Sequence, residues 1–254
     1  MENPKFFAIA REIIDKIEKT QSGNLMQVAD LYARSIAAGG LVHLWGSGHS
    51  AIGVQETFPR IGSIVGFHPI LELPLTYYTN VVGPSGLRQA LFLERVSGYA
   101  ETVLQNYEFG PEDCFVVISS TGINSGAIEI ALGAKKRGMP VVAITSLAHQ
   151  AKTVSRHSSG KKLSEVADFV IDNCTPPGDA SIKVEGCDYP TSSTSSVAVV
   201  TIVQTLNALV AERLIELGVK PLILASPHFV ESEQESQRNI EEYYKEFRRR
   251  TRRL

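Results

Sequence analysis

Short apolar runs that alternate with helical patterns restrict the fold of this sequence more than any other feature. The runs are LVHLW (41–45), CFVVIS (114–119), PVVAIT (140–145) and DFVIDN (168–173). Helical periodicity follows at about 125–137 and returns at about 195–218. Strands that alternate with helices form βαβ units, which require a parallel sheet with helices on both faces. We therefore predict an α/β fold, a three-layer α-β-α sandwich with a parallel sheet.

The first forty residues have a helical pattern of their own. Apolar residues recur at intervals of three and four over 4–19 and again over 24–38, with Gly23 between the two stretches. This pattern predicts an N-terminal helical hairpin (1–40) packed on the rest of the chain (41–254). We expect that part to end in a strand over 222–225 and a helix over 231–250. A length of 254 residues with 43% hydrophobic and 20% charged residues suits one structural domain.

Charge and cysteine content argue against several functional classes. The formal net charge is −2, and the basic cluster at 248–253 suits a helix end, so we expect no nucleic-acid partner. Three cysteines without a CxxC pair, and six histidines without HxH or HxxxH spacing, predict no disulfide framework and no metal site. No continuous apolar run approaches the ~20 residues that span a membrane. We expect a cytoplasmic protein without a cofactor or a membrane partner.

The loop SSTGINSG (119–126) leads from the second apolar run into a helix, where parallel sheets bind ligands. Ser119, Ser120, Thr121 and Ser125 carry hydroxyls, and Gly122 lets a ligand approach the backbone closely. Together with the unpaired N–H groups of the helix, these residues favour a phosphate monoester. The sequence lacks GxxxxGK[ST], which argues against a nucleotide P-loop. The alternative is that the hydroxyls only cap the helix.

A glycine turn follows the first apolar run. Gly46, Ser47, Gly48 and His49 have only part of the GxGxxG spacing, and no acidic residue follows at a strand end about twenty positions on. A dinucleotide is therefore poorly supported, and we assign the turn to the substrate site instead. His49 either contacts the substrate or caps the next helix.

Hydroxyl side chains also cluster immediately before the long helix that begins near residue 195. Among them, Ser193 and Thr194 are assigned to the same site, since a set of hydroxyls can hydrogen-bond a polyhydroxylated ligand. The alternative for each of them is again capping of the helix.

Three stretches together resemble the sugar isomerase (SIS) domain family. They are the strand, GSG turn and helix at 41–56, VVISSTGINSGAIEIALGAKKRGMPVVAIT (116–145) and SGKKLSEVADFVIDN (159–173). The resemblance covers about 41–218, and the whole chain is similar to uncharacterised bacterial SIS proteins. It implies a flavodoxin-like fold and a cytoplasmic homodimer with its site near the subunit interface. It also implies a phosphorylated sugar bound by the hydroxyls of the 119–126 loop.

Two glutamates match a subgroup of this family, the N-acetylmuramic acid 6-phosphate etherases. GSGHSAIGVQE resembles their G[TS]SGRLG…E segment, and ALFLERVSGYAE resembles their AxxxAVEGAED helix, which points to Glu56 and Glu94 as catalytic carboxylates. Glu94 interrupts an apolar helix face, where burial raises a carboxyl pKa. The alternative is a surface glutamate paired with Arg88 or Arg95, and Glu56 has a similar alternative.

The resemblance extends in part to the phosphoheptose isomerases. His228, in SPHFVESEQ, is similar to the histidine that those enzymes supply from a late helix. The alternative for this segment is the capped start of the last helix.

Two candidate carboxylates favour elimination, because one group takes a proton and the other protonates the departing oxygen. We expect a lyase that removes water from an amino-sugar 6-phosphate such as N-acetylglucosamine 6-phosphate, a substrate that the etherase resemblance implies. The alternatives are an aldose-ketose phosphosugar isomerase and a non-catalytic sugar-phosphate sensor that regulates a partner. A DNA-binding regulator is not expected, since only forty residues precede the first strand.

Overall fold

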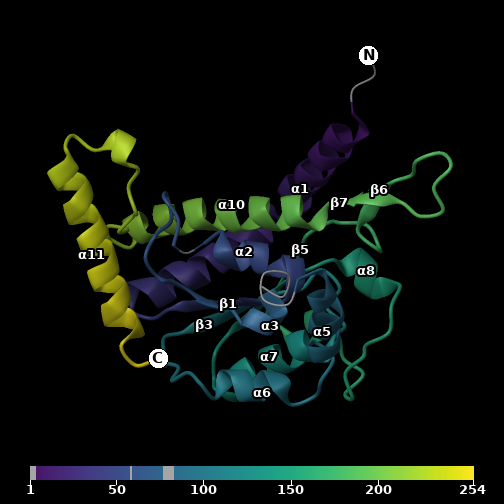
Figure 1. The fold of residues 1–254 in the computed structure, drawn as a ribbon. Coiled ribbons are helices and arrows are strands. Elements are labelled where there is room, and N and C mark those ends of the chain that lie inside the picture. Colours follow the sequence, from purple (N-terminus) through teal and green to yellow (C-terminus); the bar gives the residue numbers. More distant parts are fainter. Residues whose placement is uncertain (1–3, 58, 77–82) are drawn as a thin grey trace.

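The computed structural model describes residues 4–57, 59–76 and 83–254, and its centre is a five-stranded parallel sheet (Figure 1). The four predicted runs form strands within one residue of the expected bounds, and a short fifth strand was missed. All neighbouring strands pair in parallel. In spatial order, the strands are β2 (Phe67–Ile70), β1 (Val42–Gly46), β3 (Cys114–Ile118), β4 (Val141–Thr145) and β5 (Phe169–Asp172).

Helices cover both faces of the sheet, so the predicted α/β sandwich is confirmed. Alternate residues of β3 face two separate cores: Val116 and Ile118 pack with α1 and α10, whereas Phe115 and Val117 pack with α6 and α7. This double burial explains why the strands are continuous apolar runs. One face carries α1 (Lys5–Ala37), α2 (Ala51–Gln55) and α10 (Ser195–Glu216), and the other carries α5 (Gly86–Leu93), α6 (Tyr99–Leu104) and α7 (Ser125–Lys136).

The remaining elements connect the layers or extend from them. They are η1 (Gly48–Ser50), α3 (Leu73–Thr76), η2 (Gly83–Ser85), α8 (Leu147–Ala151), α9 (Leu163–Val166), the antiparallel pair β6 (Ala180–Ile182) and β7 (Thr191–Ser193), η3 (Pro227–Phe229) and α11 (Glu233–Thr251).

The predicted N-terminal helical hairpin is wrong, because α1 is one unbroken helix of 33 residues (Figure 1). A glycine inside a helix costs only about 1 kcal/mol, and Gly23 is tolerated here. Tertiary contacts stabilise the helix on both sides of it. The Gln21 side chain accepts a hydrogen bond from the Asp172 backbone N–H (3.0 Å), and Leu25 and Val28 are buried in the core shared with α10.

Contrary to the expectation from the sequence, α10 is long and apolar enough to span a membrane by length and composition. In this fold the helix packs against α1, with Ala198, Ile202, Leu206 and Val210 buried between the layers. Packing in the core therefore accounts for the apolar residues of this helix.

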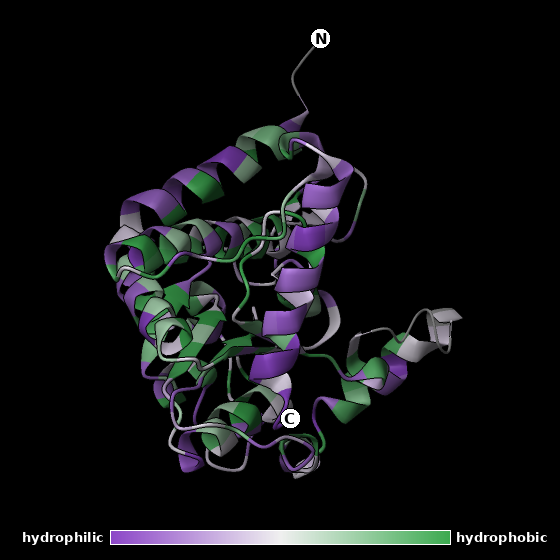
Figure 2. Cartoon of the chain, turned by 90° about the vertical axis from the view of Figure 1, so that its left-hand side faces the viewer, coloured by the Kyte–Doolittle hydropathy of each residue, from purple (hydrophilic) through white to green (hydrophobic). Residues whose placement is uncertain are grey.

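The predicted strand at 222–225 is also wrong. Among the described residues an isolated bridge joins Ile223 to Ile64, and three backbone hydrogen bonds link residues 62–65 to Leu222 and Leu224 without forming a full strand. Helix α11 holds the same segment from the other side. Asn239 donates to the Ile223 carbonyl (2.9 Å) and accepts from the Ala225 N–H (2.8 Å). The last helix itself was predicted within two residues at its start, and Figure 2 shows it as mostly hydrophilic, in front of hydrophobic strands.

A row of polar side chains, fully buried at its centre, crosses the edge where β1 and β3 begin. Arg253 donates to both carboxylate oxygens of Asp113, and Asp113 Oδ2 lies 2.9 Å from His43 Nε2. His43 Nδ1 in turn lies 3.0 Å from His68 Nδ1. Because the carboxylate is an acceptor, His43 carries its proton on Nε2, and its Nδ1 accepts from His68. Both imidazoles are therefore neutral in this arrangement.

From these two histidines we predict that the free energy of unfolding decreases at acidic pH. Burial lowers the pKa of His68 to about 3 and also lowers that of His43. An unfolded histidine titrates near pH 6.5, so below that pH only the unfolded chain takes up protons. The contribution of these neutral histidines to stability is therefore fully present above pH 6.5 and is lost progressively as the pH falls toward 3. At pH 5 the loss from His68 alone is about 2 kcal/mol.

The measurement is urea unfolding at pH 7.5 and pH 5. We expect the drop in unfolding free energy to shrink in His68→Gln, whose amide can still donate to His43. The exposed His228 provides the matched control, and His228→Gln should keep the full drop. An equal drop in all three proteins would contradict the prediction.

Candidate functional site

A cavity of about 230 Å³ lies at the carboxyl ends of β1 and β3, between the loops that follow them and the start of α10. This is the edge at which open parallel sheets bind ligands. Its lining residues are Ser47, Gly48, His49, Ser50, Leu87, Leu91, Glu94, Ser119, Ser120, Thr121, Asn124, Ala127 and Ser195.

The structure brings half of the predicted site residues together in this cavity. They come from three separate segments of the chain: the turn after β1, the end of α5 and the loop after β3. The seven are Ser47, Gly48, His49, Glu94, Ser119, Ser120 and Thr121.

Three other predicted residues lie behind the lining and shape it. Gly122 has φ +60°, and a Cβ there would come within 2.0 Å of Gln150 Nε2. Gly46 also needs to be small, since a Cβ would lie 2.8 Å from the Ser50 carbonyl oxygen. The Ser125 hydroxyl is buried and donates to the Arg156 carbonyl (3.4 Å). Their contacts here are with protein groups.

Glu56 does not line the cavity. It follows α2, where its carboxylate accepts hydrogen bonds from Gln204 Nε2 (2.9 Å) and Arg60 Nη1 (3.3 Å). In the described part of the chain the two candidate glutamates thus face different surroundings. These contacts match the alternative to a catalytic role, in which Glu56 pairs with a neighbouring arginine.

The last three predicted residues also lie outside the lining. The Thr194 N–H donates to Asp179 Oδ1 (2.9 Å), which also accepts from the Ser195 N–H (2.7 Å), so Asp179 caps α10. Ser193 is exposed in β7, and His228 is exposed in η3. The alternative, in which the hydroxyls themselves cap the helix, is therefore wrong for Thr194, because its side chain makes no capping hydrogen bond and Asp179 supplies the acceptor.

Glu94 is held in the cavity wall by two donors. Ser47 Oγ lies 3.1 Å from one carboxylate oxygen, and Asn124 Nδ2 lies 2.7 Å from the other. Burial raises the pKa of Glu94, although both the Ser47 hydrogen bond and nearby arginines oppose that shift. Asn124, whose Oδ1 accepts from Arg156 Nη1 (2.8 Å), was missed as a site residue. Its place just before α7, in the serine-rich loop, was the available signal.

The hydroxyls after β3 are arranged to donate. Ser119 Oγ accepts from the Gly122 N–H (3.1 Å), and Ser120 Oγ accepts from Asn173 Nδ2 (3.1 Å). Both oxygens thus use a lone pair inside the protein, which leaves their O–H groups for an acceptor in the cavity. Among the described residues of the lining there is no lysine or arginine. An anion would therefore be bound by hydrogen bonds more than by direct charge.

One wall of the cavity is apolar. Leu87 and Leu91 of α5 and Ala127 of α7 form the apolar part of the lining. The cavity therefore suits a polar ligand that also carries a small apolar group.

Comparison with known proteins identifies this architecture. Residues 5–146 match the SIS domain family. The chain belongs to the SIS domain family. As a SIS protein it is 34% identical over 238 residues to a UPF0309 protein of Caldanaerobacter subterraneus subsp. tengcongensis, a match that covers 92% of this chain and 94% of the relative. It is 35% identical over 242 residues to a UPF0309 protein of a Geobacillus species, with 94% of each chain covered.

The SIS fold also appears in solved structures. Phosphoheptose isomerase GmhA from Neisseria gonorrhoeae superposes with a TM-score of 0.51 at 16% identity, over 82% of this chain and 95% of that one. A phosphoheptose isomerase from Francisella tularensis gives the same TM-score at 15% identity, over 82% of this chain and 95% of that one. At this level of identity the likeness shows the fold of the SIS domain.

Proposed function

We propose that this SIS protein binds a phosphorylated sugar in the cavity and removes the proton next to its carbonyl, with Glu94 as the base. The observation that carries the proposal is that Glu94 and the hydroxyl loop at Ser119–Thr121 line one cavity. Hydroxyl donors at one end and a carboxylate in the wall match the two ends of a sugar phosphate. The names of the two solved isomerases refer to substrates of this chemical class.

Glu94 has the properties that proton abstraction requires. A carboxylate whose pKa is raised toward neutrality is a stronger base than an exposed one. Ser47 and Asn124 fix its orientation through one hydrogen bond to each oxygen. Since a single base can move a proton between adjacent carbons, this geometry supports isomerase chemistry.

Elimination of water from an amino-sugar 6-phosphate is the second candidate. Glu56 lies outside the cavity, so the acid that protonates the departing oxygen would be another group. His49 lines the same cavity as Glu94 and is able to protonate a leaving group. The apolar wall formed by Leu87, Leu91 and Ala127 supports a substrate with an N-acetyl group, because a methyl group would fit against it.

The test is proton NMR of the purified protein in deuterated water, with glucose 6-phosphate and N-acetylglucosamine 6-phosphate as separate substrates. Loss of the C2 proton signal from either sugar supports proton abstraction. A new olefinic signal would then select elimination, and a ketose product would select isomerisation. Saturable binding of both sugars without any exchange would overturn the enzymatic proposal in favour of a sensor.

Replacing Ser120 with alanine should weaken binding of the sugar phosphate by about 1 to 3 kcal/mol, because one hydroxyl donor to the phosphate is lost. Isothermal titration calorimetry measures the change, and a melting curve checks that loss of the Asn173 contact leaves the fold intact. Ser193→Ala, outside the cavity, is the matched control and should bind normally. Unchanged affinity in Ser120→Ala would remove that hydroxyl from the site.

A further inference from the structure

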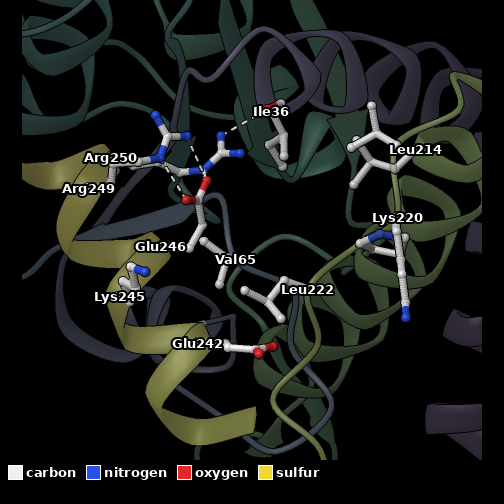
Figure 3. Close-up of a pocket in the computed structure, with 12 residues that line it drawn as sticks. Ile36, Val65, Leu214, Lys220, Leu222, Glu242, Lys245, Glu246, Arg249 and Arg250 are labelled. Carbon is white, nitrogen blue, oxygen red and sulfur yellow. Dashed lines mark hydrogen bonds and ion pairs between the residues drawn. The ribbon is translucent and has the colours of Figure 1, made fainter. Parts of the chain in front are cut away.

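A second cavity, of about 500 Å³, lies between α11, the 219–222 segment and the end of α10, whereas the start of α10 lines the proposed site (Figure 3). Its floor is apolar. Ile36, Val65 and Leu214 are buried there, and Leu222 lies beside them. In the part of the chain that the structure describes, the two cavities share no lining residue.

Two guanidinium groups in this cavity share one carboxylate. Arg249 Nε lies 2.7 Å from one oxygen of Glu246, and Arg250 Nε lies 2.9 Å from the other. Figure 3 shows this group at one end of the cavity. A single negative charge therefore faces two positive ones.

Arg250 is the buried member of this group, with its side chain only 10% exposed. Its Nη1 donates to the carbonyls of Ile36 (2.9 Å) and Gly40 (2.8 Å), and its Nε donates to Glu246. Within the described structure, Nη2 has no hydrogen-bond partner. It is not among the fully buried polar atoms that lack one, so it is accessible. Burial lowers the pKa of Arg250, so its charge is less well solvated than in water.

Two further cations, Lys220 and Lys245, line the cavity on opposite sides of Val65 and Leu222 (Figure 3). Both are exposed, and neither forms an ion pair with a described residue. Among its described lining residues the cavity thus has four cationic side chains and two carboxylates, Glu242 and Glu246. This local excess stands out on a chain whose net charge is −2.

We propose that this cavity is a second binding site, for an organic anion with an apolar body. The anionic group would take the free Nη2 of Arg250 and the charges of Lys220 and Lys245. The hydrocarbon or aromatic part would cover Val65 and Leu222. An inorganic anion would leave the apolar floor exposed to water, and a neutral hydrocarbon would leave Nη2 without a hydrogen-bond partner. A ligand with both an anionic group and an apolar body contacts both parts of the cavity. This inference does not depend on the proposed enzymatic activity.

The test uses 8-anilinonaphthalene-1-sulfonate, a fluorescent aromatic anion, titrated into the full chain. We expect saturable binding that octanoate displaces and acetate does not, since acetate has the charge without the hydrocarbon. The double variant Lys220→Glu, Lys245→Glu should bind at least tenfold more weakly. Its matched control is Lys136→Glu, Lys183→Glu, which makes the same change of net charge at exposed positions outside the cavity.

Three outcomes would overturn the proposal. Equal affinities in the two double variants would place the dye elsewhere on the protein. Displacement by acetate as effective as by octanoate would show that the apolar floor has no role. Dye binding that weakens as the protein concentration rises would assign the cavity to contact with a second copy of the chain. Melting curves of both variants establish that each is folded before it is titrated.

Discussion

Glu94→Gln is expected to lower the rate of proton exchange at the sugar C2 by about 10²- to 10⁴-fold, the usual contribution of a positioned general base. The amide cannot take up the proton, but it fits the same space. Its oxygen can accept from Asn124, and its NH₂ group can donate to Ser47, whose hydroxyl is able to reverse its role. Binding of the sugar phosphate should therefore change little while the rate is lost.

The measurement is loss of the C2 proton signal in deuterated water, with binding followed separately by calorimetry. Glu56→Gln is the matched control, since Glu56 lies outside the cavity and should be dispensable. A rate that falls in Glu56→Gln and persists in Glu94→Gln would reverse the assignment. In the wild type the rate should also decrease as the pH drops through the raised pKa of Glu94, because only the carboxylate can act as a base.

Asp113→Ala is expected to destabilise the protein by about 3 to 5 kcal/mol, because it removes a buried carboxylate on which several hydrogen-bond donors depend. The Asp113 side chain is fully buried, and it bonds to His43 and Arg253. It also accepts from the backbone N–H groups of Leu41 (2.9 Å) and Gly110 (2.7 Å). Alanine would leave these donors without their buried acceptor.

Urea unfolding at pH 7.5 measures this loss. Asp188→Ala, at an exposed position in the turn between β6 and β7, is the control and should stay within about 0.5 kcal/mol of the wild type. Arg253→Ala should cost less than Asp113→Ala, because the arginine is 31% exposed and leaves the two histidines in place. A loss below about 1 kcal/mol in Asp113→Ala would contradict this account of the buried row.

The parallel sheet was predictable because double burial makes each central strand a continuous apolar run with a recognisable start and end. The same local reasoning failed where distant contacts decide the outcome. Gly23 indicated a break in the first helix, but the contact between Gln21 and the backbone of β5 holds that helix through it. The buried row from Arg253 to His68 was not foreseen, because its members are spread over the whole chain.

The site was partly predictable for a similar reason. Residues that directly follow a strand, such as Ser47 and Ser120, are placed by the strand itself, and they do line the cavity. Glu56 stands a helix away from its strand, and each residue along a helix rotates the side-chain direction by about 100°, so a small error in the helix start changes the face on which it lies. Asn124 was missed because its role depends on Glu94, a partner thirty residues earlier.

The edge strand β2 has one further consequence. Gly66 accepts from Val42 of β1, whereas the Val65 N–H bonds to Leu222 on the other side, so odd-numbered residues of this stretch face outward. The outward residue near the end of β2 is Pro69, which has no N–H to offer. A strand from another molecule that tried to extend the sheet would lack a hydrogen bond there. The proline thus disfavours edge-to-edge pairing at β2, one of the two edge strands of the five-stranded sheet.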